Sequence, residues 1–386
     1  MQLWDGYEER VAPGTGRRAL QLTSGRGTSY PLYYFIPTFS SDAGRIVYHR
    51  AERGEVQLFS FDLATGESTQ LTTATAEKTH WIPWCVDSGR GVLDHRSCLD
   101  ATGDRVIYFD GNEARSVGVD GNDDRSLFRL KDDRLAIGQN CVSPDGEWFF
   151  YIHHDRELYD KVYPGDGSWN RSLSRGTALA GFNLNSGEHR TLVVINSPIH
   201  HVLPYGEGEL IFCHPATENG MLLTDYEGGW YTHERTQDER GGCVCHYVAT
   251  ERGIAYEILD RPDGVWSGIY NPRSHARYEF PLPREFGYTH TGRDPEGALW
   301  FFETECGESH ELWFLERHNP GSDDVWRKLT GNWPTYGGGQ KSHFHPQVAP
   351  GREWLLMTGG DSRTESNHLF LLDISDLEAT RGIPTP

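Results

Sequence analysis

The chain has 386 residues and a formal net charge of −20, which disfavours binding to nucleic acid and to anionic membranes. No stretch approaches the roughly 18 apolar residues of a membrane-spanning helix, and residues 1–6 lack the basic and apolar pattern of a secretory leader. The 7 cysteines are an odd number, which favours reduced thiols. The sequence therefore predicts a cytoplasmic protein without nucleic-acid or membrane partners.

The composition is typical of turns and β-strands, with 44 Gly, 20 Pro, 12 Trp and 18 Tyr against 3 Met. A polar turn that contains Asp or Gly, followed by an apolar run, recurs about every 45 to 60 residues, which is the period of a propeller blade. We call this pattern the recurring motif. Its apolar runs begin at Arg45, Arg105, Trp148, Leu210, Ile254, Ala298 and Trp354.

A second pattern places a hairpin after most copies of the recurring motif, for example at 59–72 and 181–193. Two hairpins per period predict blades of four antiparallel strands, and hence an all-β, seven-bladed β-propeller with a single domain over 1–386. The run 18–23 and the run 368–373 are expected to share one blade and close the ring. A two-domain β-sandwich is the alternative, and 153–172 fits neither pattern.

A glycine run at 337–339 precedes the most specific metal-site pattern in the chain. His343 and His345 are separated by one residue, so an extended strand would turn both imidazoles to one face. Gln340 follows the glycines, whose backbone freedom would bring its amide oxygen to the same point. Two imidazoles and an amide oxygen suit manganese, iron(II) or zinc. The alternative is a histidine pair in a polar loop without a metal.

His246, His290 and the 343–345 pair each stand a few residues before a recurring turn, where the inner strand of a blade is expected. If these histidines converge at one mouth of the central channel, they would form a metal-ligand shell that leaves open positions for substrate. Its members are His290, Gln340, His343 and His345. Half of a zinc site at Cys243, Cys245 and His246 is a competing interpretation, although no second cysteine pair has finger-like spacing.

Over its C-terminal half the chain resembles the oligogalacturonate lyases, a family of seven-bladed propellers in pectin degradation. Gln340-x-x-His343-x-His345 is similar to the metal segment of that family, and His290 to its third histidine ligand. His246, one blade earlier, falls where the family has its catalytic base. The resemblance implies a manganese-dependent lyase.

Two stretches depart from the family pattern. The family has an arginine immediately before a methionine, whereas Gly220 precedes Met221 and no arginine lies between His214 and Glu234. Residues 30–35 read Tyr-Pro-Leu-Tyr-Tyr-Phe, where the family has a His-Arg-Asn-Tyr-Phe motif. Both family motifs handle an anionic sugar, so substrate contacts are expected to differ here.

The resemblance implies β-elimination at a uronic acid unit of an oligogalacturonide or a related acidic oligosaccharide. A divalent metal, manganese first and zinc or iron(II) next, would bind the uronate carboxylate, and His246 would take the C5 proton. Tyr247 or Tyr288 would protonate the leaving oxygen, and Arg171, Arg235 or Lys341 would replace the missing arginine. The expected substrate-binding residues are Tyr247, Tyr288, Lys341, Arg171 and His201.

Two other functional classes remain open. A non-catalytic propeller could use the histidines to hold a structural ion and serve as a binding scaffold. A propeller hydrolase or epimerase could use the same metal on a related sugar, and a hydrolase would need paired carboxylates at the channel mouth. Asp155, Glu157 and Asp294 are too scattered in the sequence to predict that pair.

Overall fold

A computed structural model describes residues 1–77, 89–162, 176–196, 199–206, 208–214, 220–235, 242–287, 289–305 and 309–386. Within these ranges the chain is almost entirely β-structure, organised as seven mainly antiparallel sheets of four or five strands. The fold is a seven-bladed β-propeller, which confirms the prediction from the recurring motif. No helix in the described ranges has the length and apolar character needed to span a bilayer.

The chain divides into two compact units, each of which is described by itself. The first comprises Met1–Phe35, Leu63–Gly66 and Asp238–Pro386, and the second comprises Ile36–Asp62 and Glu67–Gln237. The expectation of a single domain over 1–386 stays a prediction.

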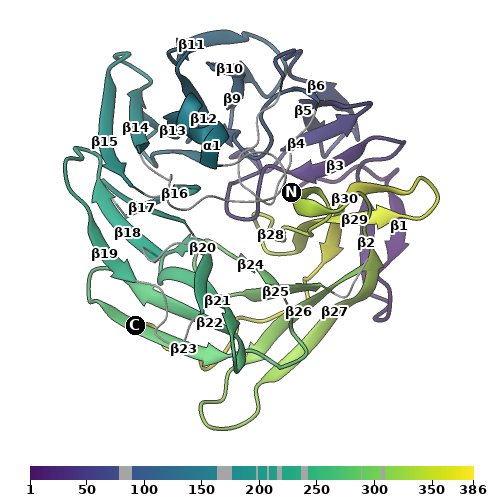
Figure 1. Ribbon diagram of the computed structural model, residues 1–386. Coiled ribbons are helices and arrows are strands. Elements are labelled where there is room, and N and C mark those ends of the chain that lie inside the picture. The colour runs from purple at the N-terminus through teal and green to yellow at the C-terminus, as the bar shows by residue number, and fades with distance from the viewer. Residues whose placement is uncertain are drawn as a thin grey trace. The chain divides into compact units, whose positions relative to one another are not determined.

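The first unit contains two complete four-stranded sheets and one sheet built from both ends of the chain (Figure 1). One complete sheet consists of β20 (Cys243–Thr250), β21 (Gly253–Arg261), β22 (Gly264–Asn271) and β23 (Ala276–Pro281). The next consists of β24 (Thr289–Arg293), β25 (Trp300–Glu305), β26 (Ser309–Arg317) and β27 (Val325–Pro334). The remaining elements are β1 (Glu8–Val11), β2 (Arg18–Gln21), β3 (Thr28–Pro31), the 3₁₀-helix η2 (Gly339–Lys341), β28 (Gln347–Val348), β29 (Trp354–Asp361) and β30 (Ser366–Asp373).

The N- and C-terminal strands share a sheet, as the sequence predicts. The strand order is β1-β2-β30-β29-β28, with Ala19 opposite Leu372 and Gln21 opposite Phe370. Ala19 and Leu372 are buried in the same apolar cluster as Leu355 of β29. The apolar residues of strands from opposite ends of the chain thus form one core.

The second unit contains three four-stranded sheets and the strands β4 (Arg45–Glu52), β5 (Glu55–Asp62), β6 (Ser68–Gln70) and β7 (Arg90–Gly91). Its first complete sheet consists of β8 (Cys98–Leu99), β9 (Arg105–Asp110), β10 (Glu113–Gly118) and β11 (Arg125–Arg129). Its second complete sheet consists of β12 (Arg134–Val142), β13 (Trp148–Asp155), β14 (Thr177–Asn183) and β15 (His189–Ile195). Its third consists of β16 (His201–Tyr205), β17 (Glu209–His214), β18 (Gly220–Asp225) and β19 (Thr232–Arg235).

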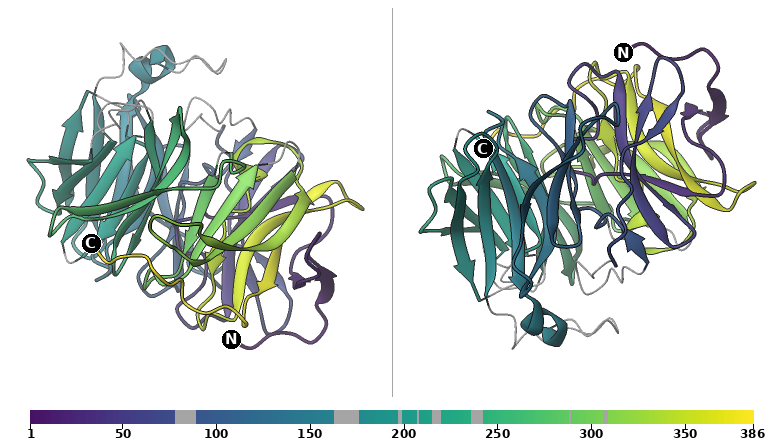
Figure 2. Two further views of the ribbon diagram at one scale, coloured as in Figure 1. Left: turned by 90° about the horizontal axis from the view of Figure 1, so that it is seen from below. Right: turned by 90° about the horizontal axis from the view of Figure 1, so that it is seen from above.

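The stretch 153–172, which the sequence patterns leave unplaced, begins in β13 and continues as helix α1 (Arg156–Val162). Figure 2 shows α1 following β13 beyond the end of its sheet. The Asp155 carboxylate accepts a hydrogen bond from the Leu158 amide at 3.0 Å, which caps the helix N-terminus. Residues 163–172 lie outside the described ranges.

Each copy of the recurring motif forms the second strand of its sheet. In the copy that leads into β13, Gly146 has a positive φ of 74° and the Asp145 carboxylate accepts the Glu147 amide at 2.9 Å. The turn thus reverses the chain and satisfies its own backbone donor before the strand begins. The seven second strands are β4, β9, β13, β17, β21, β25 and β29.

Candidate functional site

The predicted metal segment, residues 337–345, has a different local structure from the one expected. An extended strand through His343 and His345 was the wrong expectation, because the chain forms η2 at Gln340 and then an irregular loop before β28. His345 adopts a left-handed backbone with φ 47°, a conformation in which a non-glycine residue is strained. The glycine run behaves as predicted, because all three glycines at 337–339 have positive φ.

The histidines of this segment meet the histidine of β24. The ring centroid of His290 lies 4.4 Å from that of His343 and 4.8 Å from that of His345. The Gln340 amide oxygen lies 3.0 Å from His345 Nε2. All four residues are buried. The structure therefore brings the four predicted ligands together.

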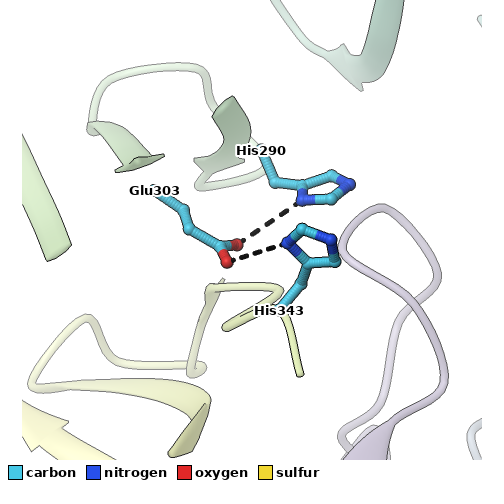
Figure 3. A group of neighbouring side chains, drawn as sticks. All are labelled: His290, Glu303 and His343. Carbon is cyan, nitrogen blue, oxygen red and sulfur yellow. Dashed lines mark hydrogen bonds and ion pairs between the residues drawn. The ribbon is translucent and has the colours of Figure 1, made fainter. Parts of the chain in front are cut away.

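Glu303 of β25 faces the imidazoles of His290 and His343 (Figure 3). Its carboxylate oxygens lie 3.6 Å from His290 Nδ1, 3.2 Å from His343 Nδ1 and 2.7 Å from His310 Nδ1. The backbone amides of Phe344 and His345 donate to the same carboxylate at 2.8 Å and 3.2 Å. Burial favours a raised pKa for Glu303, but the hydrogen bonds from the three histidines outweigh burial and hold that pKa well below its usual range.

The donor set fits a divalent cation of intermediate hardness. Three imidazoles and one amide oxygen are ligands that manganese, iron(II) and zinc accept. Two ligands about 2.1 Å from one ion and at right angles to each other are about 3 Å apart, which matches the separation of Gln340 and His345. Glu303 is engaged by three histidines and two amides, an arrangement that suits a carboxylate that fixes the orientation of imidazoles.

His246 lies beside this group on the neighbouring sheet. Its ring centroid is 4.5 Å from that of His290 and 5.9 Å from that of Tyr34. It occurs where the register of β20 against β21 shifts, and its φ of 54° is left-handed. A bulge of this kind re-aims a side chain out of the strand alternation. Two of the candidate site residues, His246 and His345, thus have strained backbones.

Tyr33 and Tyr34, next to β3 in the first unit, pack against the same imidazoles. The Tyr33 ring centroid lies 4.8 Å from that of His345, and the Tyr34 ring centroid lies 5.2 Å from that of His290. The Tyr33 carbonyl accepts a hydrogen bond from Gln347 of β28 at 2.5 Å. The stretch that departs from the family motif therefore forms one wall of the site.

The predicted substrate contacts are placed unequally. Tyr247 is fully buried and donates its hydroxyl to the Val244 carbonyl at 2.8 Å, which is a packing interaction. Lys341 is part-buried in η2, directly after Gln340, with its Nζ 5.8 Å from the Tyr30 ring centroid. His201 begins β16 in the second unit. Arg171 and Tyr288 lie outside the described residues, and so does the side chain of Arg235.

Within the described ranges, two groups of His, Cys, Asp and Glu side chains are close enough together to hold an ion. One consists of His290, Glu303 and His343, and the other of Glu305, His310 and His343. Cys243 and Cys245 belong to neither group, so the geometry does not favour a zinc site there. Asp294 accepts the backbone amides of Ala298 and Leu299 and pairs with Arg352, which is a structural role.

Sequence reasoning missed the carboxylates behind the histidines. Glu303 stands in the apolar run Trp-Phe-Phe-Glu of β25, and Glu257 stands in the apolar run Ile-Ala-Tyr-Glu-Ile of β21. A lone acid inside an apolar second strand contradicts the local pattern, and such conflicts mark functional positions. That conflict was the available signal.

Comparisons with known proteins agree with this fold. The chain is 22% identical over 217 residues to the oligogalacturonate lyase of Dickeya dadantii (strain 3937), a match that spans 54% of this chain and 50% of that protein. It superposes on the crystal structure of an oligogalacturonate lyase from Vibrio parahaemolyticus with a TM-score of 0.76 and 14% identity, over 97% of both chains. An oligogalacturonate lyase in complex with manganese gives a TM-score of 0.77 at 18% identity, over 97% of this chain and 98% of that chain.

This chain resembles oligogalacturonate lyases in sequence and in fold. The sequence match spans about half the length of the Dickeya relative, and the structural matches, at their low identity, show the fold. No protein-family model matches the chain.

Proposed function

We propose that this protein is a metal-dependent polysaccharide lyase that cleaves an oligogalacturonide, or a related uronic-acid oligosaccharide, by β-elimination. The supporting observation is the convergence of His246, His290, His343 and His345 with Gln340 in one unit of a propeller that resembles oligogalacturonate lyases.

A divalent cation, manganese first, would be held by His290, Gln340, His343 and His345. When bound, it would neutralise the uronate carboxylate and make the C5 proton more acidic. His310 and Glu303 would keep the ligand imidazoles in a fixed orientation, because His310 and the ligand rings hydrogen-bond to one buried carboxylate. That the manganese complex of a relative has the same fold supports the choice of metal.

His246 would act as the general base. Removal of the C5 proton, formation of the C4–C5 double bond and cleavage of the bond from C4 to the glycosidic oxygen would leave a 4,5-unsaturated uronate on one product. The leaving oxygen would take a proton from Tyr288 or from solvent, since the hydroxyl of Tyr247 is already engaged with Val244. Lys341 would supply the positive charge that an anionic sugar requires in a chain of net charge −20.

The decisive experiment follows the ultraviolet absorbance of unsaturated uronates. Oligogalacturonides and other oligouronides are incubated with the protein, with manganese and with a chelator. A lyase produces absorbance growth that the chelator stops, whereas a hydrolase, an epimerase or a scaffold produces none.

The base assignment has its own test. His246→Ala is expected to abolish turnover and to leave manganese binding, measured by calorimetry, within about threefold of wild type, because His246 lies outside the ligand set. His290→Ala is the matched variant that should lose the metal. Normal turnover by His246→Ala would remove the histidine from the mechanism.

A further inference from the structure

A buried acid lies behind the candidate base. Glu257, in β21, is fully buried, and its Oε2 lies 3.8 Å from His246 Nδ1. This separation is within ion-pair range, and catalytic hydrogen bonds are often this loose before substrate binds. Glu257 Oε2 accepts no hydrogen bond from the described residues. One oxygen of the carboxylate is therefore available to the imidazole.

The other oxygen of Glu257 is occupied from the opposite side. Its Oε1 lies 3.6 Å from Nη2 of the fully buried Arg293 and 3.4 Å from the Ser267 hydroxyl. Burial raises the pKa of Glu257, and the positive charge of Arg293 opposes that shift. The two oxygens thus face different partners.

Arg293 is fixed in place by contacts that leave it no freedom to reach solvent. Its guanidinium lies 4.0 Å from the Trp300 ring centroid and 4.7 Å from that of Phe302. Its Nη1 donates to the carbonyls of Gly292 and Phe301 at 2.8 Å and 2.9 Å. An arginine keeps its charge in proteins, so this position presents a permanent cation to Glu257.

The same arrangement occurs twice in neighbouring sheets. In β24 and β25, His290 of the first strand faces Glu303 of the second. In β20 and β21, His246 of the first strand faces Glu257 of the second. The carboxylate of β25 orients imidazoles of the candidate metal shell, which indicates that the carboxylate of β21 orients an imidazole as well.

From this geometry we infer that Glu257 and Arg293 are positioning residues, which hold His246 with its proton on Nδ1 and leave Nε2 as the proton acceptor. The inference rests on the proposed function for its catalytic meaning. Arg293 fixes Glu257 Oε1, Glu257 Oε2 accepts Nδ1–H, and Nε2 takes the C5 proton. The imidazolium that forms then stands next to a carboxylate whose geometry was set before substrate arrived.

The first test requires no turnover. Nitrogen chemical shifts of histidine side chains in the metal-free, ¹⁵N-labelled protein report which ring nitrogen carries the proton, and His246→Gln identifies the signal. We expect Nδ1–H in wild type and a mixture of both forms in Glu257→Gln. An Nε2–H form in wild type, or an unchanged form in Glu257→Gln, would overturn the inference.

The second test is kinetic and uses a matched control. Glu257→Gln is expected to lower kcat about 10- to 100-fold, with KM and manganese affinity within about threefold of wild type. Asp324→Asn breaks a part-buried pair of the same chemistry, since His318 Nδ1 lies 2.9 Å from the Asp324 carboxylate outside the site, and it should leave kcat unchanged. A loss of kcat in Glu257→Gln that the control reproduces, or an equal loss of manganese affinity, would make Glu257 merely structural.

The role of Arg293 is tested by charge. Arg293→Lys should keep His246 mainly in the Nδ1–H form, whereas Arg293→Met should lose it. If Arg293→Met does not fold, the double variant Glu257→Gln/Arg293→Met replaces it, because that variant has no unpaired buried charge at this position. Its His246 should show the same mixture of Nδ1–H and Nε2–H forms as Glu257→Gln alone. A wild-type Nδ1–H form in the double variant would overturn the role of the pair. Absence of turnover by wild type on every oligouronide would refute the proposed function and leave the tautomer result standing.

Discussion

At the scale of single residues, the candidate site combines two kinds of charge. Buried carboxylates face the imidazoles, while Lys341 follows the ligand Gln340 and is only part-buried. The carboxylates cannot bind an anionic sugar, and Gly220 precedes Met221 where the resemblance to oligogalacturonate lyases leads one to expect an arginine. Lys341 is the described candidate for that contact in the metal segment.

We therefore expect Lys341→Met to raise KM about tenfold, equivalent to about 1.4 kcal/mol, with a smaller effect on kcat. Lys341→Arg should retain most of the affinity because it keeps the charge. Lys328→Met removes a lysine that is paired with Glu311 instead and serves as the control. Steady-state kinetics on an oligogalacturonide measure all three, and an unchanged KM in Lys341→Met would assign the charge to another residue.

A histidine of the second unit predicts how stability depends on pH. Burial in β13 lowers the pKa of His153 to about 4, and its Nδ1 has no partner among the described residues. The unfolded chain binds this proton near its ordinary value of about 6.5. Its contribution to stability is therefore complete above about pH 6.5 and is lost progressively as the pH falls toward 4.

Urea unfolding at about pH 7.5 and about pH 5 tests this dependence. The free energy of unfolding of His153→Gln should fall on acidification by about 2 kcal/mol less than that of wild type. His275→Gln, at an exposed histidine, should behave like wild type. Identical acid losses in wild type and His153→Gln would contradict the assignment.

At the scale of elements, η2 depends on a backbone that only glycine adopts readily. Gly338 caps η2 with φ 64° and ψ 173°, a region that costs a side chain about 1 to 3 kcal/mol. A Cβ at Gly338 would meet no atom within 4 Å. A substitution there therefore acts through the backbone of the ligand segment and not through a clash.

Gly338→Ala should weaken manganese binding about tenfold or more, since strain of about 1.4 kcal/mol corresponds to a factor of ten. Gly321→Ala is matched, because Gly321 also has a positive φ and open space around it, but it lies in another loop. Calorimetric titration with manganese separates the two. Equal affinities in both variants would show that η2 tolerates the change.

The repeat could be recognised in the sequence because each blade reuses one turn followed by one apolar strand. The second strand of every sheet and the pairing of β2 with β30 could therefore be predicted. The proximity of Gln340 and His345 could also be predicted, because the two residues are close together in the sequence and follow a glycine run. The local structure of this segment could not be predicted, because the left-handed backbone of His345 leaves no periodic pattern in the sequence. The roles of Glu257 and Glu303 were not predicted, because each contacts a histidine on the neighbouring strand of its sheet and not a residue close to it in the sequence.

At the scale of the whole molecule, the candidate cation would join β24, η2 and the loop before β28 within the first unit. An ion that binds only the folded state stabilises it by about 2.7 kcal/mol at one hundred times its dissociation constant. Manganese should accordingly raise the thermal unfolding midpoint, and a chelator should reverse the rise. His345→Ala should show neither effect, whereas a rise that persists in that variant would place the ion elsewhere.

The sheet that joins β1 and β2 to β28, β29 and β30 has a consequence for biosynthesis. A nascent chain can pair β2 with β1 early, but the pairing of β2 with β30 must wait until residues 366–373 have left the ribosome, so this contact closes a very long loop. The ligand-bearing loop lies directly ahead of β28. A chain truncated ahead of β30 would thus leave the sheet beside the ligand-bearing loop incomplete, and we expect it to bind the candidate ion more weakly.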